Sequence, residues 1–210
     1  MDNHTFVIPA YKDSQYLEPC IISLKNQSVK SNIIITTSTP SDYIKQIAGK
    51  YSIEIIINNS KNKGIAEDWN FALAQANTSY VTIAHQDDLY EQHYTENVLH
   101  KLNYYTETLI VFTDYSELLN ENTRNNSLNL IVKKLLLFPF MFRSVITLRF
   151  FKKLLLLFGD PICCPSVTYN KTKLSGFSFS NKFSCTLDWF AWSEMSKKKG
   201  NFIFIKKNLM

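Results

Sequence analysis

The sequence predicts an α/β fold in which helices flank a mostly parallel β-sheet. In residues 1–118, short runs rich in Ile, Val and Phe alternate with segments whose apolar residues recur at helical spacing, which is the pattern of βαβ units. The chain has 210 residues, of which 45% are hydrophobic and 20% are charged, values typical of a soluble globular domain. Its five glycines and six prolines exclude a low-complexity chain.

Strands and helices are predicted in alternation along this first half. The predicted strands are 5–11, 32–37, 53–57, 79–84 and 109–115. The predicted helices begin at Asp13 or Ser14 and at 38–42, and cover 65–76 and 93–105. Right-handed crossovers place the carboxyl ends of such strands at one edge of the sheet, where open α/β sheets bind their ligands.

The second half is less regular. Residues 120–129 are rich in Asn and Thr and predict a loop. Residues 162–169 predict a strand in which Pro165 indicates an edge or a bulge. A helix is predicted from Leu187 through Met195, followed by a final strand at 202–205.

Charge is distributed unevenly between the two halves. Residues 1–129 carry 9 Lys and Arg against 15 Asp and Glu, a net −6, and residues 130–210 carry 14 against 3, a net +11. Near 130–158 the cations alternate with Leu and Phe in a basic-apolar segment that we expect to be helical and that is too short to span a membrane. It suits helices lying in a membrane interface, or core helices with a solvated basic face. Binding of single-stranded nucleic acid ranks third, because no nucleic-acid motif accompanies the segment.

The four cysteines indicate a reducing compartment. Cys20, Cys163, Cys164 and Cys185 match neither a zinc pattern nor a disulfide framework, so buried, reduced thiols are expected. The N-terminus lacks the basic and apolar order of a signal peptide. Both observations predict a cytoplasmic protein.

Two adjacent carboxylates follow the strand predicted at 79–84. The strand runs directly into His85, Asp87 and Asp88. Carboxylate oxygens at the end of a strand suit Mg²⁺ or Mn²⁺, which bind through carboxylates and the phosphates of a substrate. The alternative is a solvated turn, which also favours Asp.

Five motifs in register carry a family resemblance. They are Phe6–Tyr11, Asn62–Ala66 with Asn70, Asp87-Asp88, Gly176-Phe177 and Leu187-Asp188-Trp189. In this order they resemble glycosyltransferase family 2 and its GT-A fold. The pairing of Cys163-Cys164-Pro165 with Leu187-Asp188-Trp189 is similar to bacterial surface-polysaccharide transferases within that family.

The resemblance implies a role for each matching position. Pro9, Ala10 and Tyr11 would line the nucleotide pocket, Lys63, Gly64, Asn70 and Asp87 would lie near the nucleotide, Asp87 and Asp88 would bind Mn²⁺ or Mg²⁺, and Asp188 would be the general base. Other interpretations remain for three of these: Asp188 also suits a helix cap, Tyr11 a loop aromatic and Gly64 a glycine that starts a helix. His85, at the first position of the aspartate motif, suits either a metal ligand or a neutral donor to phosphate. Thr36-Thr37-Ser38 stand where many members carry acidic residues, so the nucleotide contacts are expected to differ.

The implied protein is an inverting, metal-dependent glycosyltransferase. It would move a sugar from a UDP- or dTDP-linked donor to a lipid-linked glycan in bacterial cell-surface polysaccharide synthesis, as a peripheral protein at the inner face of the cell membrane and without nucleic acid. Residues 1–210 would form one domain, with a nucleotide-sugar half (1–118), a basic-apolar insertion (119–158) and an acceptor-side half (159–210). Relatives usually continue past Met210 with a histidine- and arginine-bearing stretch, so a truncated or non-catalytic nucleotide-sugar-binding subunit is the alternative.

Overall fold

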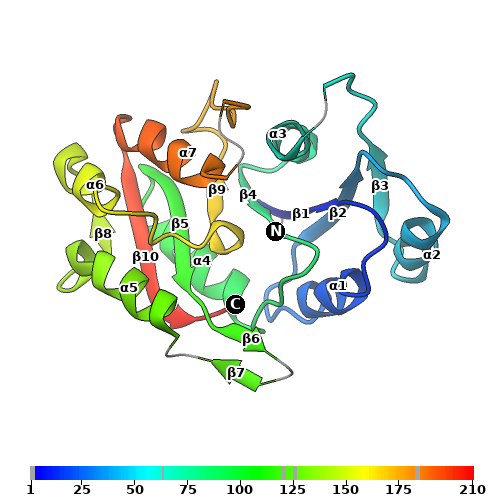
Figure 1. Cartoon of the computed structure of the whole chain (residues 1–210), viewed down its shortest axis with the longest axis horizontal. Helices are drawn as coiled ribbons and strands as arrows, with labels where there is room; N and C mark the ends of the chain where they lie inside the picture. The colour runs from blue at the N-terminus through cyan, green and yellow to red at the C-terminus, as the bar shows by residue number, and fades with distance from the viewer. Residues whose placement is uncertain (1–2, 63, 120–121, 125–126, 183–184) are drawn as a thin grey trace.

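A single large sheet organises the molecule. The computed structural model describes residues 3–62, 64–119, 122–124, 127–182 and 185–210. Within them, eight strands pair in the order β3-β2-β1-β4-β9-β5-β10-β8 (Figure 1). These strands are β1 (His4–Ala10), β2 (Asn32–Thr37), β3 (Glu54–Ile57), β4 (Tyr80–Ile83), β5 (Thr108–Asp114), β8 (Val145–Ile146), β9 (Thr168–Asn170) and β10 (Asn201–Asn208).

The sheet is mostly parallel, as predicted. Strand β1 runs parallel to β2 and β4, β2 to β3, and β5 to β10. Strand β9 lies antiparallel between β4 and β5, and β8 lies antiparallel on β10. Because β9 joins the two parallel groups, β4 lies directly beside a strand from the second half of the chain.

Helices cover both faces of the sheet. Core residues of α1 (Leu17–Lys25), α2 (Asp42–Lys50) and α4 (Tyr94–Tyr104) pack together with Phe6 and Ile8 of β1. Core residues of α3 (Ile65–Gln75), α6 (Arg149–Leu155) and α7 (Leu187–Ser196) pack with Ile110 and Phe112 of β5. Successive strand residues point to opposite faces, so these two clusters are the two faces of an α/β/α sandwich.

Two local predictions were wrong in part. The loop expected at 120–129 contains β7 (Asn122–Arg124), which pairs with β6 (Glu117–Leu119), and α5 (Leu128–Leu136) begins where the Ser127 hydroxyl accepts the Leu130 N–H. The strand expected at 162–169 is a 3₁₀ turn, η2 (Cys164–Ser166), followed by β9. Proline has no N–H to donate to a ladder, so pairing starts only after Pro165.

The basic-apolar segment is helical, as expected. It comprises α5, the 3₁₀ turn η1 (Phe138–Phe140), β8 and α6. In the part of the chain that the structure describes, no helix combines the length and the apolar character needed to cross a bilayer. Cys20 and Cys164 are buried, as expected, whereas Cys163 is partly buried and Cys185 is exposed.

Candidate active site

A large cavity opens at the carboxyl ends of β1, β2 and β4. Its volume is about 790 Å³. It is lined by Pro9 near the end of β1 and Tyr11 after it, Ser38 and Thr39 after β2, Gly64, Ile65, Asp68 and Trp69 at the start of α3, and His85, Gln86 and Asp87 after β4. The cavity therefore lies where open α/β sheets bind their ligands, and it includes four of the residues predicted to bind nucleotide: Pro9, Tyr11, Gly64 and Asp87.

The side chain of Gln86 fixes the main chain of Tyr11. Its Oε1 accepts the Tyr11 N–H at 3.2 Å, and its Nε2 donates to the Tyr11 carbonyl at 3.0 Å. The next residue, Lys12, has a φ of 56°, a left-handed conformation that is uncommon outside glycine, and its N–H donates to Thr39 Oγ1 at 2.6 Å. These contacts hold the half-exposed ring of Tyr11, 52% of which is accessible, at the edge of the cavity.

His85, Asp87 and Asp88 form a cluster that suits a divalent cation. Their candidate ligand atoms lie within 4.8 Å of one another, and His85 Nδ1 is 3.8 Å from Asp88 Oδ2. The His85 ring stacks on Trp69, with centroids 5.0 Å apart. Its Nε2 is buried and has no hydrogen-bond partner among the described residues. One imidazole and two neighbouring carboxylates fit the donor set of a Mn²⁺ or Mg²⁺ site.

Burial sets the protonation of this cluster. Burial and, to a smaller extent, the neighbouring charge of Asp87 together raise the pKa of Asp88 to about 7. Burial lowers the pKa of His85 to about 4, against opposing effects of Asp87 and Asp188, so the imidazole is neutral at pH 7. A neutral imidazole has a free lone pair, and a cation binding here would take the place of the proton on Asp88.

Asp188 lies close to this cluster although it is far away in the sequence. It is the second residue of α7, and its Oδ1 accepts the Trp189 N–H at 2.9 Å. The charges of Asp87 and Asp188 both act to raise the pKa of His85, so both carboxylates lie near that imidazole. The charge of Asp188 and burial also raise the pKa of Asp160 to about 7.

Asp68 is a cavity residue that the sequence analysis missed. Its Oδ2 accepts the Ser38 hydroxyl at 3.0 Å, and its Oδ1 accepts from Asn58 Nδ2 at 2.9 Å. Acidic residues are common in the first turn of a helix, where they interact favourably with the helix dipole. The position of Asp68 in the sequence therefore did not indicate a role in binding. The structure thus places a carboxylate from α3 beside the end of β2, where the sequence offers only Thr and Ser.

The backbone at the start of α3 is shaped by Gly64. This residue lines the cavity and has a φ of 128°, which side-chain-bearing residues rarely adopt. The predicted neighbour Lys63 lies outside the described residues. Gly64 therefore lets the chain turn sharply into α3 at the edge of the cavity.

Two predicted site residues occupy other positions. Asn70 binds the backbone of Phe179 through both amide atoms, at 2.9 and 2.7 Å, and lines a neighbouring cavity with Gly176 and Phe177. Its role here is to hold the segment that precedes α7. Ala10 is the last residue of β1 and is buried in the core, because alternate strand residues face inward.

Comparison with known proteins identifies the family. The family model "Glycosyl transferase family 2" matches residues 5–174. The curated protein "Glycosyltransferase GlyA" of Streptococcus pneumoniae is 28% identical over 119 residues, which are 55% of this chain and 17% of that protein. This chain thus spans about a sixth of its curated relative.

Solved structures share the fold. The structure of S. aureus TarS 1-349 matches with a TM-score of 0.73 and 15% identity, over 98% of this chain and 59% of that one. The mannosyltransferase PcManGT from Pyrobaculum calidifontis, in complex with GDP-Man and Mn²⁺, matches with a TM-score of 0.69 and 13% identity, over 98% and 55%. These matches confirm the predicted GT-A fold. The chain belongs to glycosyl transferase family 2.

Proposed function

We propose that this protein is an inverting, metal-dependent glycosyltransferase that uses a nucleotide-diphosphate sugar. The observation that carries the proposal is the cluster of His85, Asp87 and Asp88, with Asp188 near the imidazole, at the edge of a cavity of about 790 Å³. A cavity of that size suits a nucleotide. The carboxylates supply both a metal site and a candidate base.

Each group has a defined part in the reaction. The base of the nucleotide would lie against Tyr11, and Gly64 would allow the backbone to approach the diphosphate. His85, Asp87 and Asp88 would hold Mn²⁺ or Mg²⁺, which would supply positive charge to the diphosphate leaving group. Asp188 would take the proton of the acceptor hydroxyl as that oxygen bonds to the anomeric carbon. The bond from that carbon to the diphosphate breaks, and its electron pair leaves with the nucleoside diphosphate.

Solved structures of relatives support a proposal for the sugar donor, and the acceptor is proposed with it. Structures of TarS have been solved with UDP and with UDP-GlcNAc. For this chain we propose a UDP-linked sugar as the donor, with a dTDP-linked sugar as the alternative. The acceptor that we propose is a glycan hydroxyl carried on a lipid in bacterial cell-surface polysaccharide synthesis. A peripheral position at the inner face of the cell membrane would give access to such a lipid.

Titration calorimetry tests the donor site directly. We expect UDP to bind in the presence of Mn²⁺ and to bind at least about tenfold more weakly after chelation, because the diphosphate would then face uncompensated carboxylates. A screen of UDP-, dTDP- and GDP-sugars for hydrolysis then identifies the donor. Metal-dependent binding without turnover of any sugar would favour a non-catalytic binding subunit. Absence of binding to every nucleoside diphosphate would refute the donor site.

Replacing Asp68 by asparagine tests how the nucleoside is recognised. Ser38 and Asn58 orient this carboxylate at the cavity wall, where it would accept hydrogen bonds from the nucleoside. Hydrogen bonds to a charged group contribute about 1.5–3 kcal/mol, so we expect UDP to bind about tenfold or more weakly to Asp68→Asn. Glu67→Gln is the control, because this adjacent, half-buried acid of α3 accepts a hydrogen bond from Asn181 and does not line the cavity. Equal affinities of the two variants for UDP would argue against this role.

A further inference from the structure

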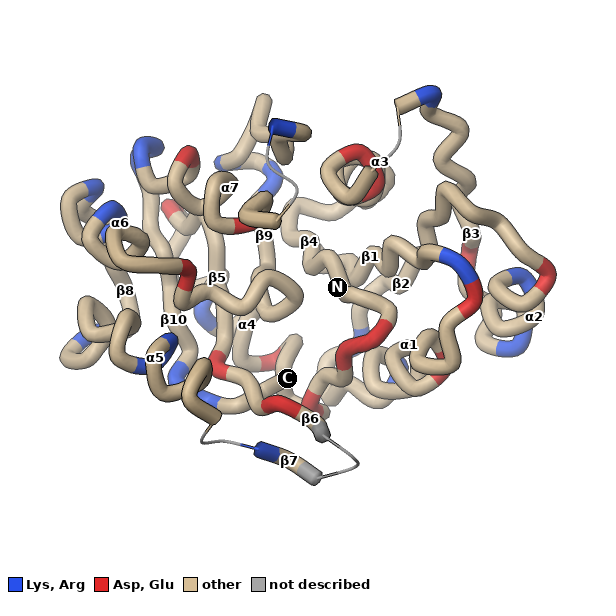
Figure 2. Tube along the Cα trace, viewed as in Figure 1, with Lys and Arg blue, Asp and Glu red and all other residues tan. Residues whose placement is uncertain are grey.

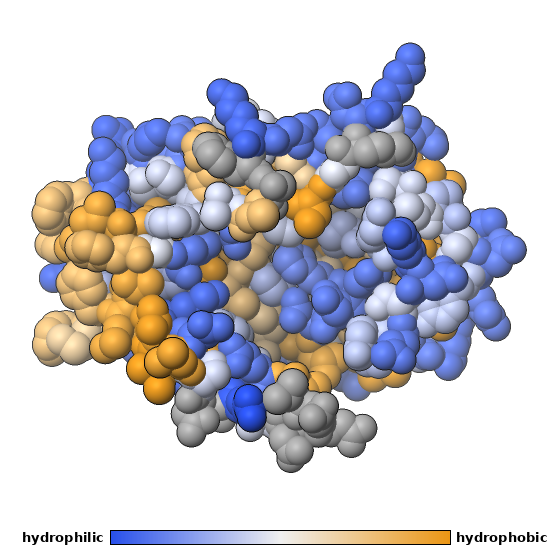
Figure 3. All heavy atoms as spheres, in the orientation of Figure 1, coloured by the Kyte–Doolittle hydropathy of each residue, from blue (hydrophilic) through white to orange (hydrophobic). Residues whose placement is uncertain are grey.

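The segment from α5 to α6 presents an unusual surface. Large apolar side chains are exposed along it, namely Leu128, Leu135, Phe142, Leu148, Phe150 and Phe158. Phe142 is 89% accessible and Phe150 is 69% accessible. Figure 3 shows the resulting apolar area over the side of the molecule that carries α5 and α6. Contiguous apolar surface of this kind usually marks an interaction site.

This surface stands on a fixed base. Leu130 of α5, Phe140 of η1 and Leu155 of α6 are buried. Lys152 of α6 is also fully buried, and its Nζ donates to the carbonyls of Lys198 and Gly200 at 2.7 and 2.9 Å. Lys152 belongs to the basic-apolar segment, but it holds α6 to the turn that follows α7 and does not face solvent. The exposed apolar side chains therefore project from anchored helices and from the short segments that adjoin them.

All exposed charges within this segment are positive. Lys134, Arg143, Arg149 and Lys153 are exposed, and the sequence contains no Asp or Glu between Glu121 and Asp160. Figure 2 shows Lys and Arg positions along α5 and α6. In a two-fold dimer formed through this surface, the four cations of one copy would face the same four cations of the other, and these like charges would repel each other. An anionic lipid surface would instead attract all four cations.

We propose that the exposed side of the segment from α5 through α6 to Phe158 is a docking face for an anionic membrane surface. Phe142, Phe150 and their apolar neighbours would enter the boundary between headgroups and acyl chains. Lys134, Arg143, Arg149 and Lys153 would contact the phosphates of anionic headgroups. The charge complementarity and the apolar tips together select a lipid surface as the occupant.

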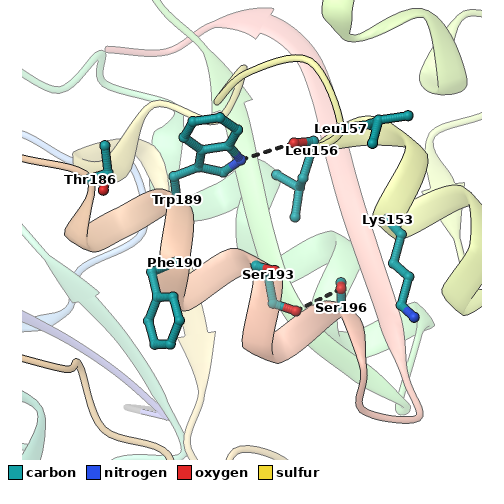
Figure 4. A pocket seen from close by; sticks show the side chains of 8 residues that line it. All are labelled: Lys153, Leu156, Leu157, Thr186, Trp189, Phe190, Ser193 and Ser196. Atoms are coloured by element: carbon teal, nitrogen blue, oxygen red, sulfur yellow. Dashed lines mark hydrogen bonds between the residues drawn. The ribbon is translucent and has the colours of Figure 1, made fainter. Parts of the chain in front are cut away.

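The docking face is continuous with the helix that carries Asp188. Between α6 and α7 lies a mainly apolar groove of about 400 Å³, lined by Lys153, Leu156 and Leu157 on one side and Trp189, Phe190 and Ser193 on the other (Figure 4). Trp189 Nε1 donates to the Leu156 carbonyl at 3.0 Å, so the end of α6 is tied to the residue that follows Asp188. This step rests on the proposed function, in which Asp188 is the base. Docking through α6 would then bring the acceptor side of the site close to a glycan carried in the membrane.

Vesicle sedimentation of the full chain tests the docking face. We expect at least about tenfold stronger binding to vesicles of phosphatidylcholine with 30% phosphatidylglycerol than to phosphatidylcholine alone, and weaker binding at about 0.5 M salt because charges are then screened. The double variant Phe142→Ser/Phe150→Ser and the variant Arg143→Glu/Arg149→Glu should each lose most of this binding.

Matched controls lie elsewhere on the surface. Tyr104, an aromatic that is 75% accessible on α4, and Lys45, an exposed cation on α2, lie outside the docking face. Tyr104→Ser and Lys45→Glu should bind vesicles like the unaltered protein. The proposal is overturned if the unaltered protein binds neither vesicle, or if the docking-face variants bind as well as the controls. A salt-resistant dimer that Phe142→Ser/Phe150→Ser dissociates, without vesicle binding, would assign the face to a second copy.

Nucleotide titration of the same variants separates this proposal from the proposed function. Phe142→Ser/Phe150→Ser should bind UDP and Mn²⁺ as the unaltered protein does, because neither residue lines the nucleotide cavity. Loss of vesicle binding with normal UDP binding supports the docking face. Normal vesicle binding by a protein that binds no nucleoside diphosphate would leave the docking face standing and refute the donor site alone.

Discussion

Replacing Asp188 by asparagine is expected to slow sugar transfer about 10²- to 10⁴-fold, the range that general bases contribute. The amide cannot take the proton of an acceptor hydroxyl, although it can still accept the Trp189 N–H that holds the side chain at the start of α7. The affinity for UDP should change little, because the base acts on the acceptor. Steady-state transfer rates and UDP titration on the same preparation check both expectations.

Two comparisons make the Asp188 result specific. Glu194→Gln removes an acid from the same helix, one that pairs with Lys197 on the surface, and should transfer sugar at the normal rate. Asp160→Asn tests the nearby carboxyl whose pKa burial and Asp188 raise to about 7. If Asp188→Asn keeps full activity while Asp160→Asn loses it, Asp160 is the base and our assignment is wrong.

Replacing Asp88 by asparagine is expected to abolish the metal dependence of UDP binding. The substitution removes one of three clustered ligands, and we expect Mn²⁺ affinity to fall more than about 100-fold, since even indirect ligand partners contribute about 10- to 100-fold. In the unaltered protein, burial raises the pKa of Asp88 to about 7. Because bound metal requires the deprotonated carboxylate, Mn²⁺ binding should weaken about tenfold per pH unit as pH falls below that pKa.

Calorimetric titrations of Mn²⁺ and UDP between pH 5.5 and about 8 measure these effects. Glu91→Gln is the matched control, since Glu91 lines a neighbouring cavity with Asp88 but lies outside the cluster. We expect its Mn²⁺ affinity and pH dependence to match those of the unaltered protein. Unchanged Mn²⁺ binding by Asp88→Asn would show that the ion is held elsewhere.

Local sequence determined the strands and helices of the first half. The runs at 32–37 and 53–57 became β2 and β3, and the helix expected at 65–76 became α3, because apolar spacing and capping residues act over a few positions. The same reasoning failed at Asn122–Arg124 and at Cys164–Ser166. There, pairing with β6 and the missing N–H of Pro165 decided the outcome, and propensity did not.

The candidate site divides in the same way. The sequence by itself placed Asp87 and Asp88 after a strand, placed Gly64 directly before a helix, and gathered cations among Leu and Phe in 130–158. Only the tertiary structure brought Asp188 beside His85, carried Asp68 to the end of β2, turned Asn70 toward Phe179 and buried Lys152. The physical reason is distance along the chain: spacing fixes the local backbone, whereas the order of strands in the sheet decides which distant side chains meet.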